Sequence, residues 1–128
     1  MNYEKSKIRK KYFKIRKKKY SKVKKFPFFL IFKLIKKIFK NRKIIIAGYY
    51  PSYKEVNILN FLDKAAKKKY ITALPKIKNN NNMVFKHWKF KEPLCVNKYG
   101  ILEPQKNQNE IVPDLFLVPL LAFDNKLN

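Results

Sequence analysis

The sequence is short of several residue types, and each shortage excludes a class of protein. Cys95 is the only cysteine among 128 residues, so an internal disulfide framework is excluded and a reducing compartment is expected. His87 is the only histidine, and no cysteine or acidic cluster at metal-ligand spacing surrounds it. We therefore predict that Cys95 is a small, partly buried side chain and that His87 is structural or exposed.

Long apolar runs are also absent. The stretch 26–32 is too short to span a bilayer, and Lys33, Lys36 and Lys37 interrupt the sequence that follows it. The basic start of the chain is too long for a signal peptide, and no small-residue cleavage site comes after it. We therefore expect a cytoplasmic protein without a membrane partner.

Acidic residues are scarce, and the charge balance is extreme. The chain has 32 Lys and Arg against 8 Asp and Glu, and 29 of the basic residues are lysines. Residues 1–43 contain 19 basic side chains and a single acid, Glu4. Codon bias is one explanation, because Lys, Asn, Ile, Phe and Tyr have A+T-rich codons and make up more than half of the chain. A functional explanation is an anionic partner: nucleic acid, a phosphorylated ligand or acidic lipid.

The length allows at most one small domain, which we divide into a basic helical start, 1–42, and an α/β body, 43–128. A hydrophobic share of 46% is too high for a disordered chain. Apolar spacing predicts helices over 3–20, 27–40 and 56–69. The second helix should bury a broad apolar face, made of Phe28, Ile31, Leu34, Ile35, Ile38 and Phe39. The third helix should bury a smaller set, made of Ile58, Leu59, Leu62 and Ala66.

Strand signals complete the predicted fold. Strands are expected over 44–49, 70–74 and 115–118, with 83–85 at an edge of the sheet and a loop over 91–109. Pro75 is expected to stop the second strand. Strand, helix, strand within this length implies parallel pairing. The prediction is therefore an α/β fold, a three-layer sandwich with a mostly parallel sheet.

The last predicted strand points to a site. Leu115–Val118 lies between prolines and predicts a strand buried on both faces, with Asp124 beyond its carboxyl end. Ligands of open α/β sheets bind at that end. The residues expected to form the rest of such a site do not follow. We therefore expect the chain to be the front part of a longer α/β enzyme that stops before its phosphate-binding loop.

Two further groups have chemistry suited to binding. Lys5 and Arg9 are one helical turn apart on one face, where two cations can grip a polyphosphate; a solvated face is the alternative. Glu55 is expected at the amino end of the third helix, where a carboxylate is favoured by the helix dipole; capping that helix is its alternative role.

A series of residues in chain order resembles the 5-formyltetrahydrofolate cyclo-ligase family, also called methenyltetrahydrofolate synthetase. No single mark is specific, but the order and spacing over essentially the whole chain are. The marks are Lys5-x-x-x-Arg9, Tyr50-Pro51-x-x-x-Glu55, Leu74-Pro75, Met83-Val84-Phe85 with Trp88, Tyr99-Gly100-Ile101-x-Glu103-Pro104, and Asp114-Leu115-x-Leu117-Val118-Pro119-x-x-Ala122-Phe123-Asp124.

The resemblance implies a Rossmann-like sheet and an ATP-dependent ring closure. In the family, ATP phosphorylates the formyl oxygen of 5-formyltetrahydrofolate, the neighbouring folate nitrogen attacks, and phosphate leaves to give 5,10-methenyltetrahydrofolate. Mg²⁺ accompanies the ATP. No enzyme nucleophile is required, so positioning and charge neutralisation should dominate catalysis. We expect no specific nucleic-acid partner, and we expect a monomer.

The family's roles transfer to matching positions of this sequence. Lys5 and Arg9 match nucleotide-phosphate contacts, and Glu55 matches the acid that binds the folate. Tyr50 and Tyr99 match positions lining the folate pocket, where Tyr99 would stack on the pterin. Asp124 matches the acid just before the family's glycine loop. That loop, Arg-Leu-Gly-x-Gly-x-Gly-x-Tyr-Asp, is absent, and neither Gly48 nor Gly100 replaces it. We therefore expect this chain alone to be inactive.

Two alternatives use the basic start instead. Tyr3, Tyr12, Phe13 and Tyr20 are interleaved with cations, a pattern that suits RNA or ribosome binding by phosphate contacts and base stacking. A membrane-surface helix over 28–39 is the third hypothesis, because basic amphipathic segments also bind lipid.

Overall fold

The computed structural model describes residues 3–20 and 27–126, and it divides into two compact units. One unit combines Met1–Phe26 with Pro119–Asn128, and the other is Pro27–Val118. We describe each unit by itself. In the part of the chain that the structure describes, no helix combines the length and apolar character needed to cross a membrane.

The first unit is built on the predicted first helix, which is confirmed as α1 (Tyr3–Lys19). Its charges follow the helix dipole, with Glu4 in the first turn and basic side chains throughout the last. None of its residues is buried, and Ile8 of the expected apolar stripe is 51% exposed. The Arg16 guanidinium donates a hydrogen bond to the Leu120 carbonyl at 2.9 Å, which ties the helix to the segment after residue 118.

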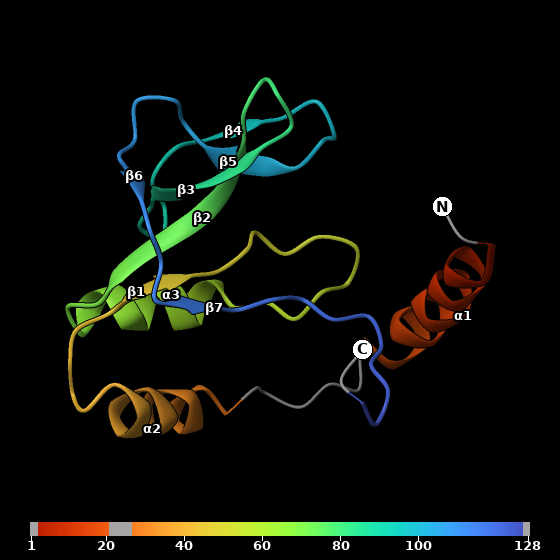
Figure 1. The fold of residues 1–128 in the computed structure, drawn as a ribbon, viewed down its shortest axis with the longest axis horizontal. Coiled ribbons are helices and arrows are strands. Elements are labelled where there is room, and N and C mark those ends of the chain that lie inside the picture. Colours follow the sequence, from red (N-terminus) through yellow and green to blue (C-terminus); the bar gives the residue numbers. More distant parts are fainter. Residues whose placement is uncertain (1–2, 21–26, 127–128) are drawn as a thin grey trace. The chain divides into compact units, whose positions relative to one another are not determined.

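The second unit contains a mixed sheet, a hairpin and two helices (Figure 1). The five-stranded sheet has the order β6-β3-β2-β1-β7, and β4 and β5 form a separate pair. The bounds are α2 (Phe28–Ile38), β1 (Ile45–Ala47), α3 (Leu59–Lys67), β2 (Ile71–Ile77), β3 (Met83–His87), β4 (Leu94–Val96), β5 (Leu102–Pro104), β6 (Glu110–Ile111) and β7 (Leu115–Phe116). The α/β class is confirmed, and the hairpin replaces most of the loop expected over 91–109.

The sheet is parallel in one half only. β1 pairs parallel to β2 and to β7, as expected for a strand–helix–strand connection, whereas β2–β3 and β3–β6 are antiparallel. The expectation of a mostly parallel sheet is therefore wrong for β3 and β6. A short hairpin connection joins β2 to β3, which allows the antiparallel pairing.

Pro75 does not stop the second strand, contrary to the prediction. β2 continues to Ile77, and Pro75 pairs with Phe85 of β3. The Trp88 amide donates to the Thr72 carbonyl at 3.0 Å, and the alternation of an antiparallel ladder then turns the Pro75 nitrogen away from β3. On the other side, the pairing with β1 ends at Ala73. A residue without an N–H is tolerated there because no neighbouring strand needs its donor.

Two strands occupy different places from those predicted. β3 is not at an edge, because β6 covers it. β7 was expected to be buried on both faces over 115–118, but it has two residues and lies at one end of the strand order. Phe116 is 48% exposed and Val118 is 66% exposed, so an edge position explains the difference. The Phe116 ring contacts Phe85 edge-on at 5.0 Å between centroids.

The core lies between the helices and the central strands. Phe32 of α2 stacks on Phe61 of α3 with ring centroids 4.7 Å apart, and both join a cluster with Ile46, Leu74 and other buried side chains. The predicted α2 face is corrected in two ways. Phe32, which the prediction omitted, is buried, whereas Leu34 and Ile38 are 55% and 66% exposed. The helix is therefore rotated so that Phe28, Phe32, Ile35 and Phe39 face the core.

The third helix begins later than predicted. α3 starts at Leu59, and the Asn57 side-chain oxygen accepts the Leu59 N–H at 3.0 Å just before it. Its buried residues are Phe61, Leu62 and Ala65. Ala65 therefore takes the inward position that was expected for Ala66. Gly48, at the end of β1, packs directly on this helix. An added Cβ there would lie 2.9 Å from the terminal methyl groups of Ile58 and Leu62, so a larger residue would force these core side chains to shift.

Candidate functional site

The loop 48–58 follows the carboxyl end of β1, the strand that lies between β2 and β7 and is parallel to both. This is the end of a parallel sheet at which ligands bind. The loop is held by its own hydrogen bonds. The Tyr49 hydroxyl donates to the Val56 carbonyl at 2.8 Å, and the Glu55 amide donates to the Ser52 carbonyl at 2.9 Å. The structure therefore presents an ordered turn, not an open linker, at this end of the sheet.

Glu55 is the acidic group of this loop. Its Oε2 accepts the Ser52 amide at 2.9 Å and lies 3.4 Å from the Ser52 hydroxyl. Within residues 3–20 and 27–126, its second oxygen has no hydrogen-bond partner. The alternative that Glu55 caps α3 is wrong, because that helix starts four residues later. The carboxylate is half-buried, fixed by the backbone at one oxygen, and able to accept from a ligand at the other.

The two candidate tyrosines lie on different elements. Tyr50 belongs to the same loop as Glu55 and packs, half-buried, at the margin of the core cluster. Tyr99 lies in the turn between β4 and β5 and is 56% exposed, with the Lys98 ammonium 5.2 Å from its ring centroid. Figure 1 shows that turn apart from the loop after β1. A pocket that includes Tyr50, Glu55 and Tyr99 stays a prediction.

The turn that presents Tyr99 is built by one asparagine. The Asn97 side-chain oxygen accepts the Tyr99 N–H at 2.9 Å and the Ile101 N–H at 3.1 Å. Gly100 has φ of 74°, which favours glycine. The aromatic ring is therefore carried on a defined turn, exposed and available for stacking.

The remaining candidates belong to the other unit. Lys5 and Arg9 are both exposed on α1 and lie one helical turn apart, as the sequence predicts. Asp124 is exposed, and its Oδ1 accepts the Lys126 N–H at 2.8 Å. That these side chains meet Glu55 in one pocket stays a prediction.

A buried ion pair between β2 and β5 was not predicted from the sequence. The Lys76 ammonium donates to Glu103 Oε1 at 2.6 Å and to the Pro104 carbonyl at 2.7 Å, and both side chains are about nine-tenths buried. Glu103 Oε2 accepts the Ile77 amide at 3.1 Å and the Asn97 amide group at 3.2 Å. Burial raises the pKa of Glu103, but hydrogen bonds from Lys76, Ile77 and Asn97 more than offset it, so the pKa lies below its ordinary value.

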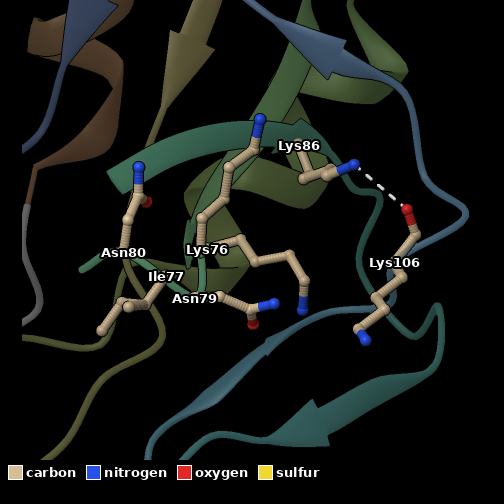
Figure 2. Close-up of a pocket in the computed structure, with 7 residues that line it drawn as sticks. Lys76, Ile77, Asn79, Asn80, Lys86 and Lys106 are labelled. Carbon is tan, nitrogen blue, oxygen red and sulfur yellow. Dashed lines mark hydrogen bonds between the residues drawn. The ribbon is translucent and has the colours of Figure 1, made fainter. Parts of the chain in front are cut away.

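A lysine-lined hollow beside this pair was not predicted either (Figure 2). Its volume is about 410 Å³, and it is formed by the end of β2, the turn after it, β3 and the loop before β6. The polar side chains around it are Lys76, Lys78, Asn79, Asn80, Lys86 and Lys106. Its lysines come from segments that are far apart in the sequence, so no local motif predicted that they would meet.

The described ranges contain no group of three or more His, Cys, Asp or Glu side chains placed to hold a metal ion. His87 pairs with Ala73 in the β2–β3 ladder and is half-buried, as the structural alternative predicts. Cys95 is half-buried, with its sulfur 3.5 Å from the Glu103 carbonyl and 3.7 Å from the Lys76 ammonium.

Comparison with known proteins places these features on a known fold. No protein-family model matches the sequence, and no curated protein sequence does so. A solved structure does match: the NMR structure of Aquifex aeolicus 5,10-methenyltetrahydrofolate synthetase, at 25% identity and a TM-score of 0.64. The chain is similar in fold to a methenyltetrahydrofolate synthetase. The match covers 94% of this chain and 62% of the synthetase, so the chain spans less than two-thirds of that protein's length.

The match supports the family resemblance seen in the sequence. It extends over nearly the whole chain. The neighbour is an enzyme of folate chemistry by its description, and its α/β fold agrees with the mixed sheet observed.

Proposed function

We propose that this chain serves the cyclo-ligase reaction that converts 5-formyltetrahydrofolate and ATP to 5,10-methenyltetrahydrofolate, ADP and phosphate. The observation that supports it is the structural match to a methenyltetrahydrofolate synthetase over 94% of the chain.

Under this proposal each candidate side chain has a defined task. Glu55 would accept hydrogen bonds from the amino-pyrimidine edge of the pterin, using the oxygen that Ser52 leaves available. Tyr50 would line that pocket, and Tyr99 would stack on the pterin ring. Lys5 and Arg9 suit the phosphates of ATP, because two exposed cations one turn apart can bind successive phosphate groups. Positioning of this kind replaces covalent catalysis.

ATP supplies the phosphoryl group that activates the formyl oxygen. The residues described offer cations for its phosphates but no cluster of metal ligands. Mg²⁺ therefore stays an expectation that accompanies ATP, and we assign no ligand to it in this chain.

The test is equilibrium binding of 5-formyltetrahydrofolate to the full chain, measured by calorimetry. Replacing Glu55 with alanine should weaken binding by roughly tenfold to a hundredfold, because a hydrogen bond to a charged group contributes about 1.5–3 kcal/mol. Glu55→Gln keeps an acceptor for the Ser52 amide but loses the charge, so it should show a smaller loss. Ser52→Ala is the matched control, since it removes the 3.4 Å hydroxyl contact and leaves the carboxylate. Unchanged binding by Glu55→Ala would refute the assigned role.

RNA binding through α1 is a second candidate, favoured by one observation. The helix has ten basic residues and one acidic residue, buries none of its side chains, and exposes Tyr3, Tyr12 and Phe13 among the cations. Such a surface suits phosphate contacts and base stacking.

The prediction is steeply salt-dependent binding of single-stranded RNA that is lost when residues 1–25 are deleted. Fluorescence anisotropy measures it, from low salt to about 0.15 M. Loss of binding at the higher salt, or equal binding by the deletion variant, would refute RNA binding through α1.

A further inference from the structure

The lysine-lined hollow has an excess of positive charge. Four ammonium groups surround it, from Lys76, Lys78, Lys86 and Lys106. Two carboxylates neutralise part of that charge. Glu103 pairs with Lys76 at 2.6 Å, and Glu110 lies 3.0 Å from Lys78 and 3.8 Å from Lys86. Four ammonium groups against two carboxylates leave a net charge of +2 around the hollow, with Glu110 shared by two lysines.

Lys86 is the cation of the hollow that is held in place by backbone hydrogen bonds. Its side chain is only 12% exposed, and its ammonium donates to the carbonyls of Lys106 and Gln108 at 3.1 and 2.9 Å. Carbonyls orient the ammonium without cancelling its charge, and a third N–H remains for another acceptor. Figure 2 shows the contact between Lys86 and the Lys106 carbonyl that fixes the wall of the hollow.

The floor of the hollow is rigid. The Lys76 ammonium donates to Glu103, to Pro104 and, at 3.7 Å, to the Cys95 sulfur. It therefore contributes positive electrostatic potential to the hollow more than hydrogen bonds to a ligand. Asn79 and Asn80 add side-chain amides at the opposite rim. A largely buried cation, exposed cations and amide donors around one space form a recognition pattern for an oxyanion.

We propose that this hollow binds a dianionic phosphate group. The net charge of +2 matches the two negative charges that a phosphate monoester carries near neutral pH. A ligand with a single carboxylate would neutralise only half of this net positive charge. The site is distinct from Glu55 and from the α1 cations, so it stands whether or not the proposed folate chemistry is correct.

The experiment is calorimetric titration of the full chain with inorganic phosphate at about 0.15 M ionic strength, with acetate in a parallel titration. Saturable phosphate binding with no comparable acetate binding is expected. The double variant Lys86→Gln/Lys106→Gln should weaken it by roughly tenfold to a hundredfold, because two charged donors are lost. The control Lys36→Gln/Lys37→Gln removes the same charge from exposed positions on α2 and should bind as the parent does.

A second variant keeps the test valid if Lys86 proves essential for folding. Glu110→Gln removes the carboxylate shared by Lys78 and Lys86, so phosphate should bind about threefold more tightly. Asp63→Asn, which removes an equal charge from a surface pair on α3, should have no such effect. Absence of saturable phosphate binding, or equal changes in the test and control variants, would overturn the proposal.

Discussion

Replacing Glu103 with alanine is expected to lower the free energy of unfolding by about 3–5 kcal/mol, because the change leaves the Lys76 ammonium buried without its counter-charge. The Ile77 and Asn97 donors lose their acceptor as well. Denaturant unfolding followed by circular dichroism measures the difference.

The control is a double variant, Lys76→Met/Glu103→Leu. Apolar side chains of similar size often replace a buried pair at little cost, so this variant should recover most of the lost stability. If Glu103→Ala destabilised no more than the exposed-pair variant Asp63→Ala, the pair would have no structural role.

The pH dependence has a defined sign. Because the folded pKa of Glu103 is lowered from 4.5, its ionised form stabilises the fold above that value. This contribution declines as the pH falls through the lower folded pKa. Stability of the parent chain should therefore drop on acidification more steeply than that of the double variant.

Replacing Phe61 with alanine should also lower the free energy of unfolding by about 3–5 kcal/mol, the cost of truncating a fully buried aromatic residue. Phe61 is 0% exposed, and its ring contacts Phe32 at 4.7 Å and Phe28 at 5.6 Å between centroids. Its loss leaves a cavity between both helices and the sheet.

Phe29→Ala is the matched control, since Phe29 is on α2 but 70% exposed and should change stability by less than about 0.5 kcal/mol. Equal losses for the two variants, measured by denaturant unfolding, would contradict the described rotation of α2.

Periodicity predicted the helices well because it depends on local spacing. The expected helices over 3–20 and 27–40 correspond to α1 and α2. The face of α2 was harder to predict, since Phe32 and Leu34 are both apolar and only contact with Phe61 decides between them. The start of α3 was misplaced because Asn57, not Glu55, supplies the side-chain oxygen near its first residue.

Features that depend on distant parts of the chain could not be predicted from local patterns. Pro75 is compatible with a strand only because β1 pairing ends at Ala73. Lys76 and Glu103 are separated by 27 positions and meet only because the hairpin lies on β2. The loop with Glu55 was found through its motif, while its contact with Ser52 required the structure.

The seven-residue strand β2 belongs to two pairings of opposite sense, parallel to β1 through Ala73 and antiparallel to β3 through Ile77. An insertion or deletion of one residue in its shared part would shift both ladders at once. It would displace the Glu55 loop from one side and the lysine wall from the other. Length changes during evolution should therefore be tolerated in the connecting turns and eliminated within this strand.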